Sequence, residues 1–230
     1  MDSYLTRTNM LLGEDNVLSL QDKTIMVIGL GGVGGTAFEA LVRSGFKKFI
    51  IVDFDKVDVT NLNRQILYTN EDVGKVKVEA ARDRALKISP DLDIQVFNEF
   101  IDTNSLEKFN NFKIDYIIDA IDKIPSKIAI VKFAQKQNIK FLVSLGMGNR
   151  LDPSKVMITR LDKTENDPLA KKIRSILRKE DIDLKAVNVV FSKEDPLVKS
   201  SIVSSMMMVP STAGLLIAKK VIEDLLEGNK

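Results

Sequence analysis

Residues 23–45 have the sequence KTIMVIGLGGVGGTAFEALVRSG, and this stretch decides the fold. Its first part is a run of β-branched and other apolar residues, as in a buried strand. Its last part has apolar residues at helical spacing and ends in a glycine, a common helix stop. Between them Gly29, Gly31 and Gly34, with Gly32 inside the motif, have the G-x-G-x-x-G spacing. After a strand and before a helix, that spacing predicts a phosphate-binding loop.

The residues that follow extend this prediction to a nucleotide. Glycines let the backbone approach a phosphate, and a helix N-terminus supplies free N–H groups and partial positive charge. The next apolar run, 47–53, ends in Asp53, roughly 20 residues after the glycines, where an acid can accept hydrogen bonds from both ribose hydroxyls. The loop alone does not separate NAD from ATP, and a tight turn without a ligand is the alternative.

Strand-like and helical segments alternate on both sides of the loop. From residue 23 to about 148 this alternation predicts right-handed crossovers and a mainly parallel sheet with helices on both faces. The predicted strands are 23–30, 47–53, 93–100, 115–122 and 140–148, and the predicted helices are 33–45, 76–89, 103–112 and 126–138. The fold class is therefore α/β and Rossmann-like.

The pattern changes beyond residue 150. Segments 155–161 and 187–192 resemble strands, 167–180 resembles a helix between them, and 200–209 is a further strand candidate. Residues 210–228 predict a helix with Pro210 in its first turn. No Gly/Ser/Pro linker separates the two parts, so we expect a single domain over 1–230. Its nucleotide-binding part covers about 20–150 and a C-terminal extension about 151–230.

Composition limits the available chemistry. The chain has no Cys, His or Trp, and its 34 basic and 32 acidic residues give a net charge of +2. These absences exclude thiolate zinc sites, a catalytic Cys and a His general base, so chemistry must rest on carboxylates, Lys, Arg, amides and hydroxyls. The sequence shows no signal peptide and no apolar stretch of roughly 20 residues that could span a bilayer. We therefore expect a cytoplasmic protein without a membrane segment.

Polar residues after the second predicted strand favour ATP over NAD. The residues that would face the nucleotide are Asp55, Asn61, Arg64, Gln65 and Lys77. Arg64 and Lys77 carry positive charge suited to a triphosphate, whereas a dehydrogenase would need a hydride partner site. Asp122, at the end of the predicted strand 115–122, is a candidate magnesium ligand. Each residue alone has a plainer interpretation, as a solvated charge or, for Asp122, a helix cap.

These motifs together resemble a known family. GLGGVGG, VDFDKVDVTNLNRQ, GKVKVEAARDR and DAID, in this order, are similar to the ThiF/MoeB superfamily of ubiquitin-activating-like adenylating enzymes. Further segments, among them RTNMLLGEDNV, LGMGNRLDPSKV, VVFSKEDP and VPSTAGLLIA, resemble its TcdA (CsdL) branch. That branch consists of ATP-dependent tRNA threonylcarbamoyladenosine dehydratases, which cyclise the modification through an acyl-adenylate.

The resemblance implies a role for each candidate residue. The glycines would cradle the nucleotide, Asp53 would hold the ribose with Asp55 nearby, and Asp122 would bind magnesium. Four residues would position the triphosphate and offset its charge: Asn61, Arg64, Gln65 and Lys77. Arg7 matches an N-terminal arginine that related homodimers insert into the neighbouring subunit's site. The absence of Cys excludes the thioester and persulfide mechanisms of other branches and agrees with cyclisation.

A tRNA substrate needs a basic surface despite the near-neutral net charge. The predicted helix 167–180 carries the best local patch, formed by Lys171, Lys172, Arg174, Arg178 and Lys179, with Arg150 and Lys155 as weaker candidates. Positions 171, 174 and 178 share one helical face. An ordinary amphipathic surface helix is the alternative. Met206, Met207 and Met208 would be strand and core packing, or a flexible lip at a binding site.

Three other functions remain open from the sequence. The chain could adenylate the C-terminal glycine of a ubiquitin-like sulfur-carrier protein, as ThiF and MoeB do. It could bind nucleotides without turnover, or it could be an NAD-dependent dehydrogenase. Sulfur-transfer partner proteins are a further possibility, which the sequence does not decide.

Overall fold

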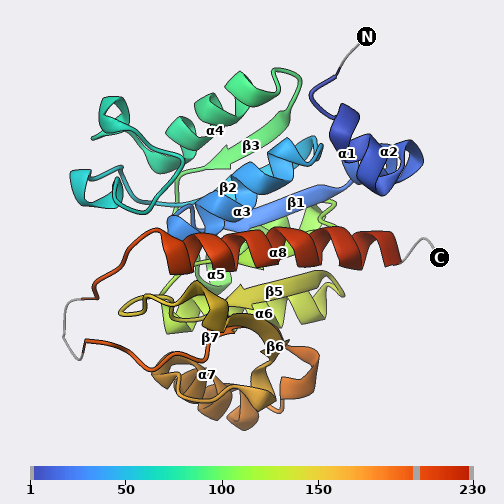
Figure 1. Ribbon diagram of the computed structural model, residues 1–230. Helices are drawn as coiled ribbons and strands as arrows, with labels where there is room; N and C mark the ends of the chain where they lie inside the picture. The colour runs from blue at the N-terminus through green and yellow to red at the C-terminus, as the bar shows by residue number, and fades with distance from the viewer. Residues whose placement is uncertain (1–2, 199–202, 228–230) are drawn as a thin grey trace.

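A seven-stranded sheet with the order β3-β2-β1-β4-β5-β7-β6 forms the centre of the molecule (Figure 1). The computed structural model describes residues 3–198 and 203–227. Every neighbouring pair of strands is parallel except β6 with β7, which is antiparallel. The strands are β1 Thr24–Ile28, β2 Lys48–Val52, β3 Asp93–Phe97, β4 Tyr116–Asp119, β5 Lys140–Ser144, β6 Val156–Arg160 and β7 Asn188–Ser192. The predicted mainly parallel sheet is confirmed.

Helices cover both faces of this sheet, as the alternation predicts. They are α1 Thr6–Leu12, α2 Glu14–Gln21, α3 Gly32–Arg43, α4 Lys77–Ile88, α5 Thr103–Glu107, α6 Ile124–Lys136, α7 Pro168–Lys179 and α8 Met208–Glu227. Alternate residues of β1 point to opposite sides: Val27 packs in a cluster with α3, α4 and α8, and Met26 in one with α5 and α6. Because both faces are buried, the strands are continuous apolar runs.

The second part of the chain extends the same sheet. β7 pairs with β5, and β6 forms the antiparallel edge. Helix α7 packs with α6 over this end of the sheet, where Ile173 and Leu177 join Val189 and Phe191 in one apolar cluster. The strand and helix predictions for 155–161, 167–180 and 187–192 are therefore confirmed.

Helices α3 and α8 lie side by side across one face of the sheet (Figure 1). Their contact requires a glycine, because a Cβ atom at Gly214 would lie 2.5 Å from the Val33 carbonyl oxygen and 2.9 Å from the Ala37 nitrogen. The start of α8 thus touches the helix that begins at the glycine loop. Within the described ranges, no helix, α8 included, has the length and apolar character needed to cross a membrane.

The segment before α8 contradicts the strand prediction for 200–209. Residues 203–206 have no regular secondary structure and α8 begins at Met208, while 199–202 lie outside the described residues. Ser204 is held by a loop: its N–H donates to Asn149 Oδ1 (2.8 Å), and Asn149 N–H donates to the Ser204 carbonyl (2.6 Å). The backbone N–H and carbonyl of Ser204 therefore find their hydrogen-bond partners in a loop and not in a neighbouring strand. Met206, Met207 and Met208 are exposed, so the core-packing interpretation is wrong.

Candidate nucleotide-binding site

A cleft of about 320 Å³ opens at the carboxyl ends of β1, β2, β3 and β4. This is the edge of an open parallel sheet where ligands bind, next to the point where the strand order reverses. Most predicted nucleotide ligands line it together: Gly29, Gly31, Gly32, Asp53, Asp55, Asn61, Arg64, Gln65, Lys77 and Asp122. The structure thus brings to one cleft residues that are up to 93 positions apart in the chain, from Gly29 to Asp122.

The glycine loop shapes one wall of the cleft. Gly29 has a φ of +91°, and a Cβ atom there would lie 2.8 Å from the Ala120 carbonyl oxygen, so only glycine fits. Gly31 and Gly32 line the cleft where α3 begins and leaves its first N–H groups free for a phosphate. Gly34 lies outside the cleft wall. A Cβ there would be 1.9 Å from the Gly29 carbonyl oxygen, so Gly34 permits close packing of α3 against the loop.

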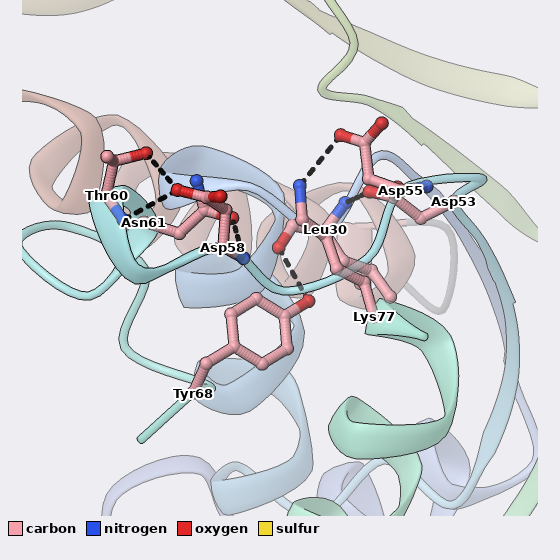
Figure 2. A network of polar contacts seen from close by, with 8 residues as sticks. All are labelled: Leu30, Asp53, Asp55, Asp58, Thr60, Asn61, Tyr68 and Lys77. Carbon is pink, nitrogen blue, oxygen red and sulfur yellow. Dashed lines mark hydrogen bonds and ion pairs between the residues drawn. The ribbon is translucent and has the colours of Figure 1, made fainter. Parts of the chain in front are cut away.

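Asp53 is held firmly at the end of β2 (Figure 2). One carboxylate oxygen accepts the Leu30 N–H at 2.7 Å, and the other accepts the Asp55 N–H at 2.9 Å. Each oxygen keeps a second lone pair, so the carboxylate can still accept two hydroxyl protons. Burial raises the pKa of Asp53 above its ordinary value, against the opposing effects of the Lys77 ammonium and the two N–H groups.

Lys77, the first residue of α4, pairs with Asp55 on the cleft wall (Figure 2). The Nζ–Oδ2 distance is 2.8 Å, and the Lys77 side chain is 6% exposed whereas that of Asp55 is 47% exposed. The ammonium of Lys77 is thus buried against one carboxylate, and that carboxylate is in contact with water. The predicted phosphate-binding lysine is thus present, buried and paired.

The segment 58–65 forms the opposite rim. Asn61 Oδ1 accepts the Asp58 N–H, and Asp58 in turn accepts from the Thr60 N–H and hydroxyl, which closes a capped turn (Figure 2). Arg64 Nη1 donates to the Thr60 carbonyl and to Asn63 Oδ1, both at 2.9 Å. These two hydrogen bonds fix the guanidinium at the cleft and use only part of its five donors.

Asp122 lies in the turn after β4, exposed, on the cleft wall. β4 ends at Asp119, so Asp122 follows the strand and does not belong to it, unlike the prediction for 115–122. Beneath this turn lies an ion pair that the sequence analysis missed. Lys127 Nζ donates to Asp119 Oδ1 at 2.9 Å and to the Ser144 carbonyl at 2.6 Å, and both side chains are 0% exposed. Burial raises the pKa of Asp119 although the Lys127 ammonium opposes it.

Apolar residues of one cluster form part of the cleft wall, named here its apolar end, and the sequence analysis did not predict them. Its walls are Ile28, Val52, Ile101 and Ile121, and Phe54 and Phe100 meet edge to face at its mouth with ring centroids 5.4 Å apart. A charged end and an apolar end in one cleft match the two halves of a nucleotide.

Two buried oxygens on the cleft wall have no hydrogen-bond partner within the described residues. They are Gln65 Oε1, beside the glycine loop, and Ser126 Oγ, in the first turn of α6. A buried polar atom without a partner is uncommon in a native protein. Both atoms are therefore candidates for contact with a ligand.

Two predicted groups lie outside the cleft. Arg7 is exposed and does not line the cleft, and its helix, α1, lies near the start of β1 (Figure 1). Of the basic helix, Lys171 and Arg178 are exposed, but Arg174 is half-buried and donates to the Thr164 carbonyl at 2.9 Å. Arg150 is buried and donates to the Glu194 carbonyl, so its side chain is not available as a surface contact.

The open sheet, glycine loop and acid after β2 define a Rossmann-like nucleotide-binding protein. More specifically, the chain belongs to the ThiF family, whose model matches residues 5–226. It is 37% identical to the tRNA threonylcarbamoyladenosine dehydratase of Bacillus subtilis, over 96% of this chain and 94% of that one. It is 36% identical to the Haemophilus influenzae dehydratase over 72% of this chain and 64% of the relative.

Solved structures agree with the sequence comparison. The crystal structure of Escherichia coli TcdA in complex with ATP has a TM-score of 0.93 and 30% identity, covering 98% of this chain and 95% of that one. The complex with AMP has a TM-score of 0.92 and 31% identity, covering 97% and 94%. The predicted family is therefore confirmed.

Proposed function

We propose that this chain is an ATP-dependent enzyme that cyclises threonylcarbamoyladenosine in tRNA with loss of water, through an acyl-adenylate. One observation carries the proposal: a single cleft gathers a glycine loop, a buried acid, a buried lysine and a fixed arginine. The dehydratase names of the relatives, which align over almost the whole chain, support the same substrate.

In this proposal the charged end of the cleft binds the triphosphate. The backbone of Gly29, Gly31 and Gly32 and the start of α3 contact phosphate oxygens, and Asp53 accepts hydrogen bonds from the ribose. Lys77 exchanges Asp55 for a phosphate. Arg64, Asn61 and Gln65 complete the opposite wall, and Gln65 Oε1 gains a partner. Such fixed groups stabilise charge in the transition state without reorganising.

The chemistry then takes two steps. A carboxylate oxygen of the substrate attacks the α-phosphorus of ATP, the bond to the bridging oxygen breaks, and pyrophosphate leaves. The carbamoyl nitrogen or oxygen of the same modification next attacks the activated carbonyl carbon. AMP leaves with one former carboxylate oxygen, and the carbamoyl N–H proton passes to solvent. The cyclic product therefore lacks the atoms of one water molecule. Both steps gain from orientation in one cleft, and neither needs a Cys or a His.

Magnesium fits the site only as a partner of the phosphates. Within the described ranges, no three acidic residues gather where they could hold a metal by themselves. Mg²⁺ commonly binds through one or two carboxylates plus substrate phosphates and keeps several waters. Asp122, exposed on the cleft wall, would provide that carboxylate. When bound, the ion would offset the negative charge of the triphosphate.

The remaining partners are also part of the proposal. We expect a homodimer in which Arg7 reaches the neighbouring subunit's cleft, since it is exposed and does not reach its own. Lys171 and Arg178, with Lys172 and Lys179, offer an exposed surface for tRNA phosphates, so binding should weaken steeply with salt. A cytoplasmic location would fit this substrate. Sulfur-transfer proteins remain candidate partners only by family resemblance.

The test is cyclisation by the purified protein. Incubation with ATP and tRNA carrying the open modification should give the cyclic nucleoside by mass spectrometry. Lys77→Ala and Arg64→Ala should abolish the product, whereas Lys75→Ala, an exposed lysine in the same loop, should not. ATP–pyrophosphate exchange driven by a ubiquitin-like carrier protein, with tRNA unchanged, would assign the chain to the sulfur-carrier activators and overturn the proposal.

A further inference from the structure

The apolar end of the cleft has the chemistry of a base-binding pocket. Ile28, Val52, Ile101 and Ile121 provide apolar walls in the same cleft as Asp53, the residue proposed to hold the ribose. A nucleobase has apolar faces and polar edges, so such a pocket needs a polar group placed at an edge. Without one, the base would lose hydrogen bonds to water on binding.

Ser126 supplies that group. It is 1% exposed, it lines the cleft, and its Oγ atom has no hydrogen-bond partner within the described ranges. A serine in a helix can donate back to the carbonyl four residues earlier, and this one does not. The hydroxyl therefore loses its hydrogen bonds to water on folding, and no hydrogen bond in the unliganded protein offsets that free energy.

The position of Ser126 on α6 directs it toward the apolar end. Ile130 lies four residues later, on the same face of the helix, and packs in the cluster that contains Ile101 and Val52. The adjacent residue, Lys127, is fixed by Asp119 and the Ser144 carbonyl, which immobilises this first turn of α6. Ser126 is thus held in place before any ligand arrives.

We infer that the Ser126 hydroxyl hydrogen-bonds to an edge of the adenine base of ATP and thereby positions the nucleotide. A hydroxyl both donates and accepts, so it can pair with a ring nitrogen or with the exocyclic amino group. The inference rests on the proposed function, because it takes ATP to be the ligand of this cleft. It adds a base-contacting residue that the sequence motifs do not contain.

The experiment compares ligands with and without a base. Calorimetry would measure the Kd of ATP and of tripolyphosphate for the full-length wild type, for Ser126→Ala and for Ser175→Ala, an exposed control on α7. Loss of one hydrogen bond predicts ATP binding about 5-fold weaker in Ser126→Ala. Tripolyphosphate affinity should stay unchanged. The melting temperature without ligand should be equal or higher, because an unsatisfied hydroxyl is removed.

Three other binding and stability outcomes would overturn the inference. Equal weakening for ATP and tripolyphosphate would mean a general effect on the cleft, and unchanged ATP affinity would mean no contact with the base. A lower melting temperature without ligand would make Ser126 a structural residue. If the wild type binds ATP but does not cyclise tRNA, the proposed function fails and the Ser126 assignment stands. If the wild type does not bind ATP, both fail.

Discussion

Two lysine–aspartate pairs lie at the same edge of the sheet and differ in their access to water. Lys77–Asp55 joins α4 to the loop after β2 at 2.8 Å, and Asp55 is 47% exposed. Lys127–Asp119 joins α6 to the end of β4 at 2.9 Å, and both side chains are 0% exposed. Both residues of the first pair line the cleft, and Asp55 is in contact with water. The second is sealed beneath the turn that carries Asp122.

The two pairs have the same chemistry, but their different access to water gives them different expected roles. A sealed pair must keep both members, because either one alone is a buried charge without compensation. In the open pair Asp55 stays hydrated when Lys77 is removed, so the loss of this lysine should cost little stability. We therefore expect the sealed pair to determine folding and the open pair to determine nucleotide binding.

The largest expected effect is that of Lys127→Met on stability. It leaves Asp119 buried and unpaired and removes the link to the Ser144 carbonyl, so the free energy of unfolding should fall by about 3–5 kcal/mol. Urea unfolding followed by circular dichroism measures it, with Lys77→Met as the matched control. The double variant Asp119→Leu with Lys127→Met should regain much of the loss. Equal losses in the two single Lys→Met variants would contradict the distinction.

Next in size is the effect of Lys77→Met on activity. Stability should change by less than about 1 kcal/mol, because Asp55 remains hydrated. The adenylation rate should fall roughly 100-fold or more, as for other lost transition-state contacts. Rapid-quench measurement of AMP formation with modified tRNA would show this. A near-normal rate would remove Lys77 from the proposed machinery.

Asp55→Asn should have a smaller effect, in the opposite direction. It removes the charge that competes with phosphate for Lys77, so pyrophosphate should bind about 5-fold more tightly. Product release should slow in proportion. Competition between pyrophosphate and ATP in wild type and variant provides the measurement, with Asp58→Asn, an exposed acid in the next turn, as control. Weaker pyrophosphate binding would show that Asp55 supports Lys77 in its ligand-bound position.

The smallest effect concerns pH. An ionised Asp53 is the better acceptor for ribose hydroxyls, so ATP affinity is lost as pH falls through the pKa of Asp53. That pKa is raised by burial above the ordinary 3.8. Lys77 opposes the rise and the Asp55 charge adds to it, so Lys77→Met should move the acid limit of binding to higher pH and Asp55→Asn to lower pH.

Titration of ATP affinity against pH would measure both shifts. The stability of the fold depends on the protonation of Asp53 in the opposite direction to ATP affinity. Because the folded-state pKa of Asp53 is raised, its protonation stabilises the fold below about pH 3.8, and this contribution is lost as pH rises through the folded-state pKa. Identical acid limits in the two variants would mean that neither charge acts on Asp53.

Local motifs allowed much of the fold and the charged end of the site to be predicted. The glycine loop and Asp53 depend on contiguous strand, turn and helix signals, and Arg64 belongs to a motif with strong family resemblance. By contrast, Lys127 was missed because it lies on α6 and its burial depends on partners from two strands, β4 and β5. Ser126 carries no motif, and only the packing of α6 reveals that its hydroxyl lacks a partner.

One prediction failed, and another met a contact that the sequence did not show. The segment before α8 has strand-like composition, but Ser204 pairs with Asn149, which is distant in sequence. Periodicity placed Arg174 on one face with Lys171 and Arg178, yet could not show that Thr164 would take its guanidinium. Tertiary contacts decided each case, and a single sequence does not show them.

The contact of Gly214 with α3 has a consequence for synthesis on the ribosome. The glycine loop and α3 emerge early, whereas the helix that covers α3 is translated after every strand of the sheet. Until α8 has left the exit tunnel, α3 can pack on the sheet and on α4 but lacks the helix beside it. The phosphate loop of a nascent chain therefore stands on an incompletely packed support until α8 is made, and we expect nucleotide binding to follow the synthesis of α8.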